Sequence, residues 1–158
     1  MPLVDSLVNT NPKQAIEYIQ KLNEVYPKNP ELYDNLGVAY YDIDSLKNAI
    51  DCFEKLMLYG GYEHPRGLSN IAICKMQLED YDGAIDDLIK ASEINYDYWI
   101  NLAYAYEVKG DLRSSLKYIL KYIKKRESYK DSYKYSDEYK YLISKKDSLE
   151  NEINNANN

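Results

Sequence analysis

Side chains suited to acid–base, nucleophilic or metal chemistry are few in this chain and stand far apart. Its 158 residues include one histidine, His64, and two cysteines, Cys52 and Cys74. His64 precedes Pro65 and has no serine or cysteine partner in a local motif, so a solvated loop histidine is favoured over a catalytic one. These residues are too few for a disulfide framework or for a zinc site of cysteine and histidine ligands. We therefore expect no metal site.

Phosphate-binding and carboxylate chemistry have no better support. Gly60 and Gly61 indicate an isolated helix stop, without the strand and glycine spacing of a nucleotide-binding fingerprint. The 26 Asp and Glu residues fall mostly on expected helices, where most carboxylates belong to solvated faces, and no pair converges by its spacing. The sequence therefore predicts a protein that is not an enzyme, with no catalytic residue and no cofactor.

The composition is that of a folded acidic protein of about one domain's length. Hydrophobic residues make up 45% of the chain and the formal net charge is −6, so a nucleic-acid backbone or an anionic membrane would be repelled over much of the surface. No apolar run approaches the roughly 20 residues that span a bilayer, and the first residues lack the basic start of a signal peptide. We expect a cytoplasmic protein whose partner is a protein or peptide, not nucleic acid or a membrane.

A pattern with a period near 34 residues recurs along the chain. One apolar phrase with a small residue appears three times, and each copy is followed by a polar cap and a second apolar stretch. The first phrase occupies residues 36–41, 71–76 and 102–106, and the second occupies 44–50, 80–85 and 111–116. Only 6 glycines and 5 prolines interrupt the chain, which favours long helices.

In these residues the chain resembles the tetratricopeptide repeat family, whose unit is two antiparallel helices. With Pro30, Pro65 and Tyr96 as first positions, six positions align in three copies. At positions 4, 7, 8, 20, 24 and 27 stand Tyr33, Leu36, Gly37, Ala49, Phe53 and Leu56; then Leu68, Ile71, Ala72, Ala84, Leu88 and Ala91; then Trp99, Leu102, Ala103, Ser115, Ile119 and Tyr122. Position 8 needs a short side chain because neighbouring helices approach closely there. Two departures are Tyr122, where the family prefers alanine, and Lys75, where it has tyrosine.

The resemblance implies an all-α fold, a right-handed superhelical α-solenoid of antiparallel helix pairs. The expected parts are an N-terminal partial repeat at 1–29, three repeats at 30–64, 65–95 and 96–128, and a Tyr- and Lys-rich C-terminal capping helix with a frayed end at 129–158. A fourth repeat is rejected because its frame would place Asp137 at position 8. Apolar residues on one face of the last helix would instead cover the exposed edge of the third repeat.

The resemblance also implies that the first helices line a concave groove. The groove residues expected from the family's positions are Asp34, Val38, Tyr41, Asp42, Ser69, Ile73, Met76, Gln77, Asp97, Ile100, Tyr104, Glu107 and Val108, with Glu31 and Arg66 at their edge. Their apolar members would form a floor and their acids a negative rim. We therefore expect a non-enzymatic scaffold that binds a protein segment which is basic or anchored by apolar side chains.

One kind of ligand is excluded by these positions. Some family members hold the C-terminal carboxylate of chaperones with lysine, arginine and asparagine side chains. The corresponding residues here are Asp34, Val38, Asn70, Asp97 and Asn101, and only Asn70 agrees. Two acids in place of cations would repel a carboxylate, so we do not expect a chaperone carboxylate-clamp adaptor.

The C-terminal tyrosines leave alternatives open. Six of them, Tyr122, Tyr129, Tyr133, Tyr135, Tyr139 and Tyr141, suit either packing on the last repeat or anchoring an interface. The competing hypothesis is a structural module that self-associates to a homo-oligomer through this helix, with the groove occluded. Residues 121–134 carry six basic and two acidic groups, which favours a solvated face or a complement to an acidic body in another molecule over nucleic acid.

Overall fold

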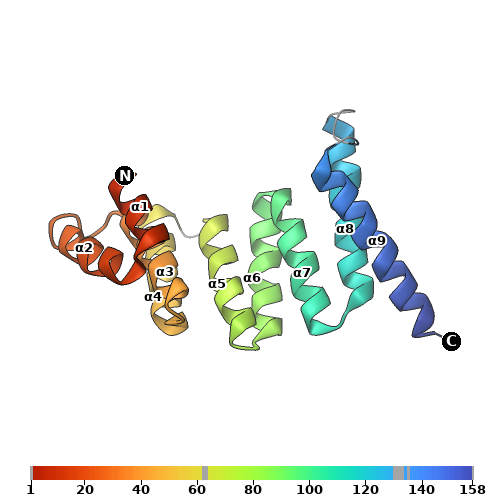
Figure 1. The fold of residues 1–158 in the computed structure, drawn as a ribbon, viewed down its shortest axis with the longest axis horizontal. Coiled ribbons are helices and arrows are strands. Elements are labelled where there is room, and N and C mark those ends of the chain that lie inside the picture. Colours follow the sequence, from red (N-terminus) through yellow and green to blue (C-terminus); the bar gives the residue numbers. More distant parts are fainter. Residues whose placement is uncertain (1, 62–63, 130–133, 135, 158) are drawn as a thin grey trace. The chain divides into compact units, whose positions relative to one another are not determined.

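The computed structural model describes residues 2–61, 64–129, 134 and 136–157, and within them the chain is helical throughout, without a strand. Successive helices pack against each other in pairs, as the repeats predict (Figure 1). The elements are α1 (Pro2–Thr10), α2 (Pro12–Val25), α3 (Pro30–Asp42), α4 (Leu46–Gly60), α5 (Pro65–Gln77), α6 (Tyr81–Ile94), the 3-10 turn η1 (Tyr96–Tyr98), α7 (Trp99–Lys109), α8 (Leu112–Tyr129) and α9 (Asp137–Asn155). None of these helices is long and apolar enough to cross a bilayer.

The contacts divide the chain into two compact units. Unit 1, Met1–Ile94, contains α1 to α6 as three helix pairs, and the last two pairs correspond to the first two predicted repeats. Unit 2, Asn95–Asn158, contains the third pair of the repeat frame, α7 and α8, followed by α9. Each unit is described by itself.

Helix starts follow the local chemistry of the sequence, with one exception. Pro12 and Pro30 occupy first turns, where a missing N–H costs nothing, and Asn11 Oδ1 accepts from the N–H of Gln14 at 3.2 Å. Among the second helices, Asp80 and Asp111 accept capping hydrogen bonds at 3.0 Å. The exception is the serine before α4, whose side chain caps no backbone N–H because its Oγ accepts from the amide of Asn48.

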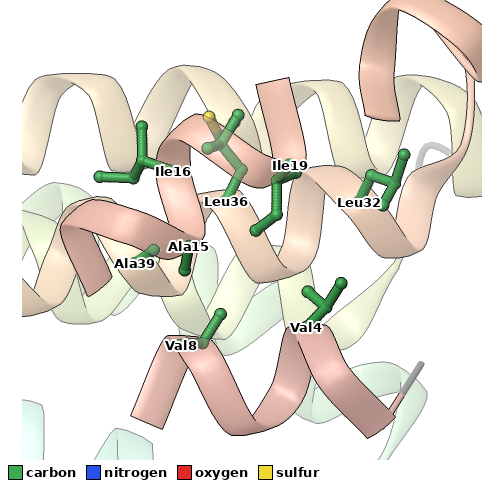
Figure 2. Close-up of a cluster of buried hydrophobic side chains, with 9 residues drawn as sticks. Val4, Val8, Ala15, Ile16, Ile19, Leu32, Leu36 and Ala39 are labelled. Carbon is green, nitrogen blue, oxygen red and sulfur yellow. The ribbon is translucent and has the colours of Figure 1, made fainter. Parts of the chain in front are cut away.

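The N-terminal core of unit 1 shows why α1 and α2 belong to the stack. In Figure 2 the side chains of Val4 and Val8 point from α1 toward α2 and α3, into the cluster that contains Ile19 and Leu32. Ile19 and Leu32 have no exposed surface. Full burial of such side chains is worth about 1.5–3 kcal/mol each, so α1, although only nine residues long, is held by its packing.

The second core of unit 1 depends on the smallest residue of the repeat frame. A Cβ atom at Gly37 would lie 2.5 Å from Cε1 of Phe53, whose ring is buried between α3 and α4. Glycine at position 8 therefore makes room for phenylalanine at position 24. Burial also raises the pKa of Cys52 to about 12 and that of Cys74 to about 11, so both cysteines are protonated structural thiols.

Two side-chain caps set the starts of helical elements in unit 2. Residues 96–98 form a 3-10 turn because the side chain of Asn95 accepts from the N–H of Asp97, and the α-helix begins only at Trp99. Residues 129–158 were predicted as the C-terminal segment; α8 ends at Tyr129, and α9 starts after Ser136, which caps it by accepting from the N–H of Tyr139. This last helix ends at Asn155.

Candidate functional site

An apolar pocket opens between the first helices of the two repeats in unit 1. It is lined by Val38, Tyr41, Phe53, Asn70 and Ile73 and has a volume of about 80 Å³. Val38 and Tyr41 come from α3 and Ile73 from α5, at the groove positions of the repeat frame. The ring of Phe53 reaches the pocket from α4 because Gly37 has no side chain to stop it. This pocket is about half the size of a cavity that holds benzene, so it can accept one small aliphatic side chain.

Polar side chains join α3 to α5 on either side of this pocket. Asp34 Oδ2 lies 2.9 Å from Nη2 of Arg66, and the amide of Asn70 donates to Asp34 Oδ1 at 3.4 Å. Toward the other end, Nε2 of Gln77 donates to the hydroxyl of Tyr41 at 2.7 Å. Burial raises the pKa of Asp34, and the nearby guanidinium of Arg66 opposes the rise without cancelling it.

These contacts change the electrostatics expected of the groove. Asp34 was expected on a negative rim, but its carboxylate is buried and neutralised by Arg66. Ser69 is only 3% exposed and contributes almost no surface. Met76 is half-buried, whereas Asp42 and Gln77 are exposed. The groove face of unit 1 is therefore less acidic than the sequence indicates, and apolar contact dominates it.

The groove positions of unit 2 are partly covered. A pocket of about 110 Å³ is lined on one side by Ile100, Ala103, Tyr104 and Glu107 of α7 and on the other by Tyr141, Leu142 and Lys145 of α9, with Ile119 of α8 beneath. Nζ of Lys145 lies 2.5 Å from Oε1 of Glu107, and this hydrogen bond raises the pKa of Lys145. The C-terminal helix thus lies against the groove face of the third repeat.

The remaining predicted residues of unit 2 are exposed. Asp97 lies in η1, before the α-helix begins, and Tyr104 and Val108 are 57% and 42% exposed on α7. Of the acids expected on the rim here, Glu107 is paired and Asp97 is exposed.

Comparison with known proteins bears on these repeats directly. The tetratricopeptide repeat family model matches residues 30–58, which are α3 and most of α4. Residues 30–58 therefore carry a tetratricopeptide repeat. A comparison with curated proteins found no match.

Solved structures with the same fold include several repeat proteins. A crystal structure of MamA is 19% identical, with a TM-score of 0.67, and the alignment covers 100% of this chain and 99% of that one. PilF of Pseudomonas aeruginosa is 19% identical, with a TM-score of 0.69 over 78% of this chain and 58% of that one. A chain of the APC/C hetero-tetramer Cut9–Hcn1 is 20% identical, with a TM-score of 0.64 over 72% of this chain and 24% of that one. At these identities the likeness establishes the fold.

Sequence reasoning missed several residues that line these pockets. Asn70 was considered only as part of a carboxylate clamp, and Phe53 only as a core residue, yet both line the pocket of unit 1. The signal for Phe53 was present, since a glycine at position 8 stands opposite an aromatic residue at position 24. Lys145 and Tyr141 had no signal in the repeat frame, because α9 lies outside it.

The residues that could hold a metal ion stand apart in the described ranges. No group of three or more His, Cys, Asp or Glu side chains in the described ranges is arranged to hold a metal ion. His64 lies immediately before α5, at the helix start. The arrangement of apolar floor and flanking amides is suited to holding a polypeptide.

Proposed function

We propose that this tetratricopeptide repeat protein is a non-enzymatic scaffold that binds a protein segment on the groove face of unit 1. The observation that carries the proposal is the apolar pocket between α3 and α5, lined by Val38, Tyr41, Phe53, Asn70 and Ile73. A repeat stack needs no such opening for its own packing, and an apolar pocket with a few polar groups at its edge is the usual form of a recognition site.

The chemistry of the pocket defines the segment that it would take. One aliphatic side chain would fill the pocket, as an anchor residue does in other peptide grooves. The amide of Asn70 uses one donor on Asp34, and its remaining hydrogen-bonding capacity would serve the backbone of the segment. Since Asp34 is neutralised by Arg66, the apolar anchor side chain contributes more to recognition than a charge on the segment does. The exposed carboxylate of Asp42 favours a basic residue in the segment next to this anchor.

The alternative function, self-association with an occluded groove, is supported only in unit 2. There α9 lies on α7 through Lys145 and Glu107, and this contact competes with a ligand for the same residues. Binding is therefore proposed for unit 1, and unit 2 serves as the capped end of the repeats.

The test compares one pocket variant with one matched variant on the other unit. Peptide display with the wild-type chain would select segments, and their affinity would then be measured for Ile73→Asp and Val108→Asp. Both substitutions place one carboxylate on a groove position, but only the first enters the pocket. We expect Ile73→Asp to weaken binding about tenfold or more, in line with loss of a buried anchor contact, and Val108→Asp to leave it unchanged. Equal effects of the two variants would contradict the proposal.

A further inference from the structure

The outer faces of α6 in unit 1 and of α8 in unit 2 differ in charge. On α8, one face presents Arg113, Lys117, Lys121 and Lys124 around Leu116 and Leu120, which we term the basic ridge. These residues line a shallow depression of about 520 Å³. Spacings of 3 and 4 residues place all six on one side of the helix. Leu120 is 43% exposed, so the ridge combines charge with an apolar contact.

Carboxylates in the described part of unit 2 do not neutralise the cations of the basic ridge. Within the described residues, none of the four forms an ion pair with a carboxylate. Arg113 donates to the amide oxygen of Asn157, and Nζ of Lys121 lies 3.9 Å from the ring centroid of Trp99. Such contacts hold the side chains in place while leaving their charge without a counterion.

The equivalent face of α6 has the opposite sign. Moving back 31 residues, one repeat, replaces Arg113, Lys117 and Lys124 by Asp82, Asp86 and Glu93, which are all exposed. The fourth cation, Lys121, is replaced by Lys90, whose Nζ lies 3.6 Å from Oδ1 of Asp87. Leu120 is replaced by half-buried Ile89. We call Asp82, Asp86, Ile89 and Glu93 the acidic ridge. The equivalent face of α4 has mixed charge, with an internal pair of Lys55 and Asp51, so this inversion distinguishes α6 and α8.

We propose that the basic ridge of one copy of this chain docks on the acidic ridge of a second copy. Three of the four cations stand at the same helical spacing as the three acids, and partly exposed apolar residues lie between the charges, Leu116 and Leu120 on the basic ridge and Ile89 on the acidic ridge. The two faces are therefore complementary in charge and in apolar contact. Because the ridges are different surfaces, the contact is heterologous, and each added copy leaves a ridge free to bind the next. No residue of the unit 1 pocket takes part, so this interface is independent of the proposed groove binding.

The test uses two charge-reversed variants and their mixture. Lys117→Glu/Lys124→Glu reverses two charges of the basic ridge, and Asp86→Lys/Glu93→Lys reverses the two matching charges of the acidic ridge. Sedimentation equilibrium at low salt should show wild-type mass rising with concentration and falling back when salt is added. Each variant alone should associate about tenfold or more weakly than wild type, because like charges then face each other at the two reversed positions, and an equimolar mixture should recover association. Recovery in the mixture also shows that both variants are folded.

A matched control and a competing occupant complete the experiment. Lys13→Glu/Lys21→Glu makes the same change in net charge on exposed sites of α2, outside both ridges, and should associate like wild type. Wild type that stays monomeric at all concentrations, or a mixture that fails to recover association, would overturn the proposal. So would a monomeric wild type that binds phosphatidylserine vesicles through Lys117 and Lys124, since the basic ridge would then be a membrane contact.

Discussion

In unit 1 the pocket on the groove face is bounded by the first helices of two repeats, α3 and α5, whereas in unit 2 the pocket on the groove face of α7 is bounded on its other side by α9. Both faces are built from the same repeat positions. In unit 1 the next first helix, α5, approaches α3 through Arg66, Asn70 and Gln77 and leaves the pocket between them. In unit 2 the following helix is α9, and Lys145 pairs with Glu107.

The repeat frame therefore sets which residues face the groove. Contact with the neighbouring helix determines how far those residues are accessible to a ligand. Position 12 is Tyr41 in unit 1, where its hydroxyl accepts from Gln77 of the next repeat. The same position is Glu107 in unit 2, where it binds a lysine from a helix outside the repeat frame. The capping helix α9 thus takes the place of a next first helix beside the third repeat, although it has no small residue at position 8.

The largest effect is expected from weakening the attachment of α9. Leu149 is 1% exposed in the core of unit 2, so Leu149→Ala should lower the free energy of unfolding by about 2–5 kcal/mol. Urea denaturation followed by circular dichroism measures this loss. Ser148→Ala, on the exposed side of the same turn, should change stability by no more than about 0.5 kcal/mol. If the two variants were equally stable, α9 would be no integral part of unit 2.

A second effect concerns the close approach that creates the pocket of unit 1. Gly37→Ala would place a methyl group 2.5 Å from the buried ring of Phe53, and we expect a loss of about 1–3 kcal/mol despite the better helix propensity of alanine. Unit 2 has Ala103 and Ile119 at the corresponding positions. Gly37→Ala/Phe53→Leu should therefore recover most of the stability in thermal melts. A single variant as stable as wild type would show that the ring moves freely.

A third effect comes from positions 11 and 23, which pair differently in the two units. In unit 1 Nζ of Lys75 lies 2.6 Å from Oδ2 of Asp87, whereas in unit 2 the rings of Tyr106 and Tyr118 stack with centroids 5.7 Å apart. Lys75→Met should cost about 1–2 kcal/mol because Asp87 is buried and keeps only the more distant Lys90.

Removing both charges tests whether the pair itself stabilises the fold. Lys75→Met/Asp87→Leu should regain most of the loss in urea denaturation, because an apolar pair replaces a partly buried ionic one. A double variant that is less stable than the single one would show that the ion pair contributes net stability at this position.

The sequence predicted the backbone of these repeats better than their side-chain partners. The pairing of helices and the small residues Gly37, Ala72 and Ala103 followed from periodicity, because burial and close approach restrict those positions to few residue types. The first helix of the third repeat was placed three residues early, since the cap at Asn95 produces a 3-10 turn that no apolar period reveals.

The site was predicted less completely, and for a physical reason. The repeat frame fixes where a Cβ atom lies, so it located Val38, Tyr41 and Ile73 on one face. The repeat frame does not identify partners on other helices. It therefore assigned Asp34 and Glu107 to a negative rim, although Arg66 and Lys145 neutralise them. Of the tyrosines left open, Tyr122 is buried, Tyr139 is half-buried, and Tyr129 and Tyr141 are exposed, while Tyr133 and Tyr135 lie outside the described residues.

Tyr122 shows how a departure from the family pattern is accommodated. Its hydroxyl donates to Oε1 of Glu138 at 2.9 Å, and its ring centroid lies 6.2 Å from that of Tyr96. The large side chain therefore occupies space between α8 and the elements on either side of it in unit 2. A polar partner on α9 satisfies its hydroxyl, which an alanine-based pattern cannot foresee.

The smallest expected effect is a pH dependence of opposite sign in the two units. Burial raises the pKa of Asp34 in unit 1, whereas hydrogen bonds from Ser114 lower the pKa of the exposed cap Asp111 in unit 2. A raised pKa means that ionised Asp34 opposes folding above its folded-state pKa, and this penalty disappears as the pH falls through it. A lowered pKa means that ionised Asp111 favours folding, and this contribution is lost as the pH falls through its unfolded and then its folded pKa.

Comparing each acid with its own amide variant isolates these contributions. Urea denaturation at neutral and at acidic pH should show wild type gaining stability relative to Asp34→Asn as the pH is lowered, and losing stability relative to Asp111→Asn over the same change. Because all other groups are shared within each pair, their titration cancels. Shifts of the same sign in the two pairs would mean that Arg66, rather than burial, controls the carboxylate of Asp34, and unit 1 would then hold a favourable ion pair beside its pocket.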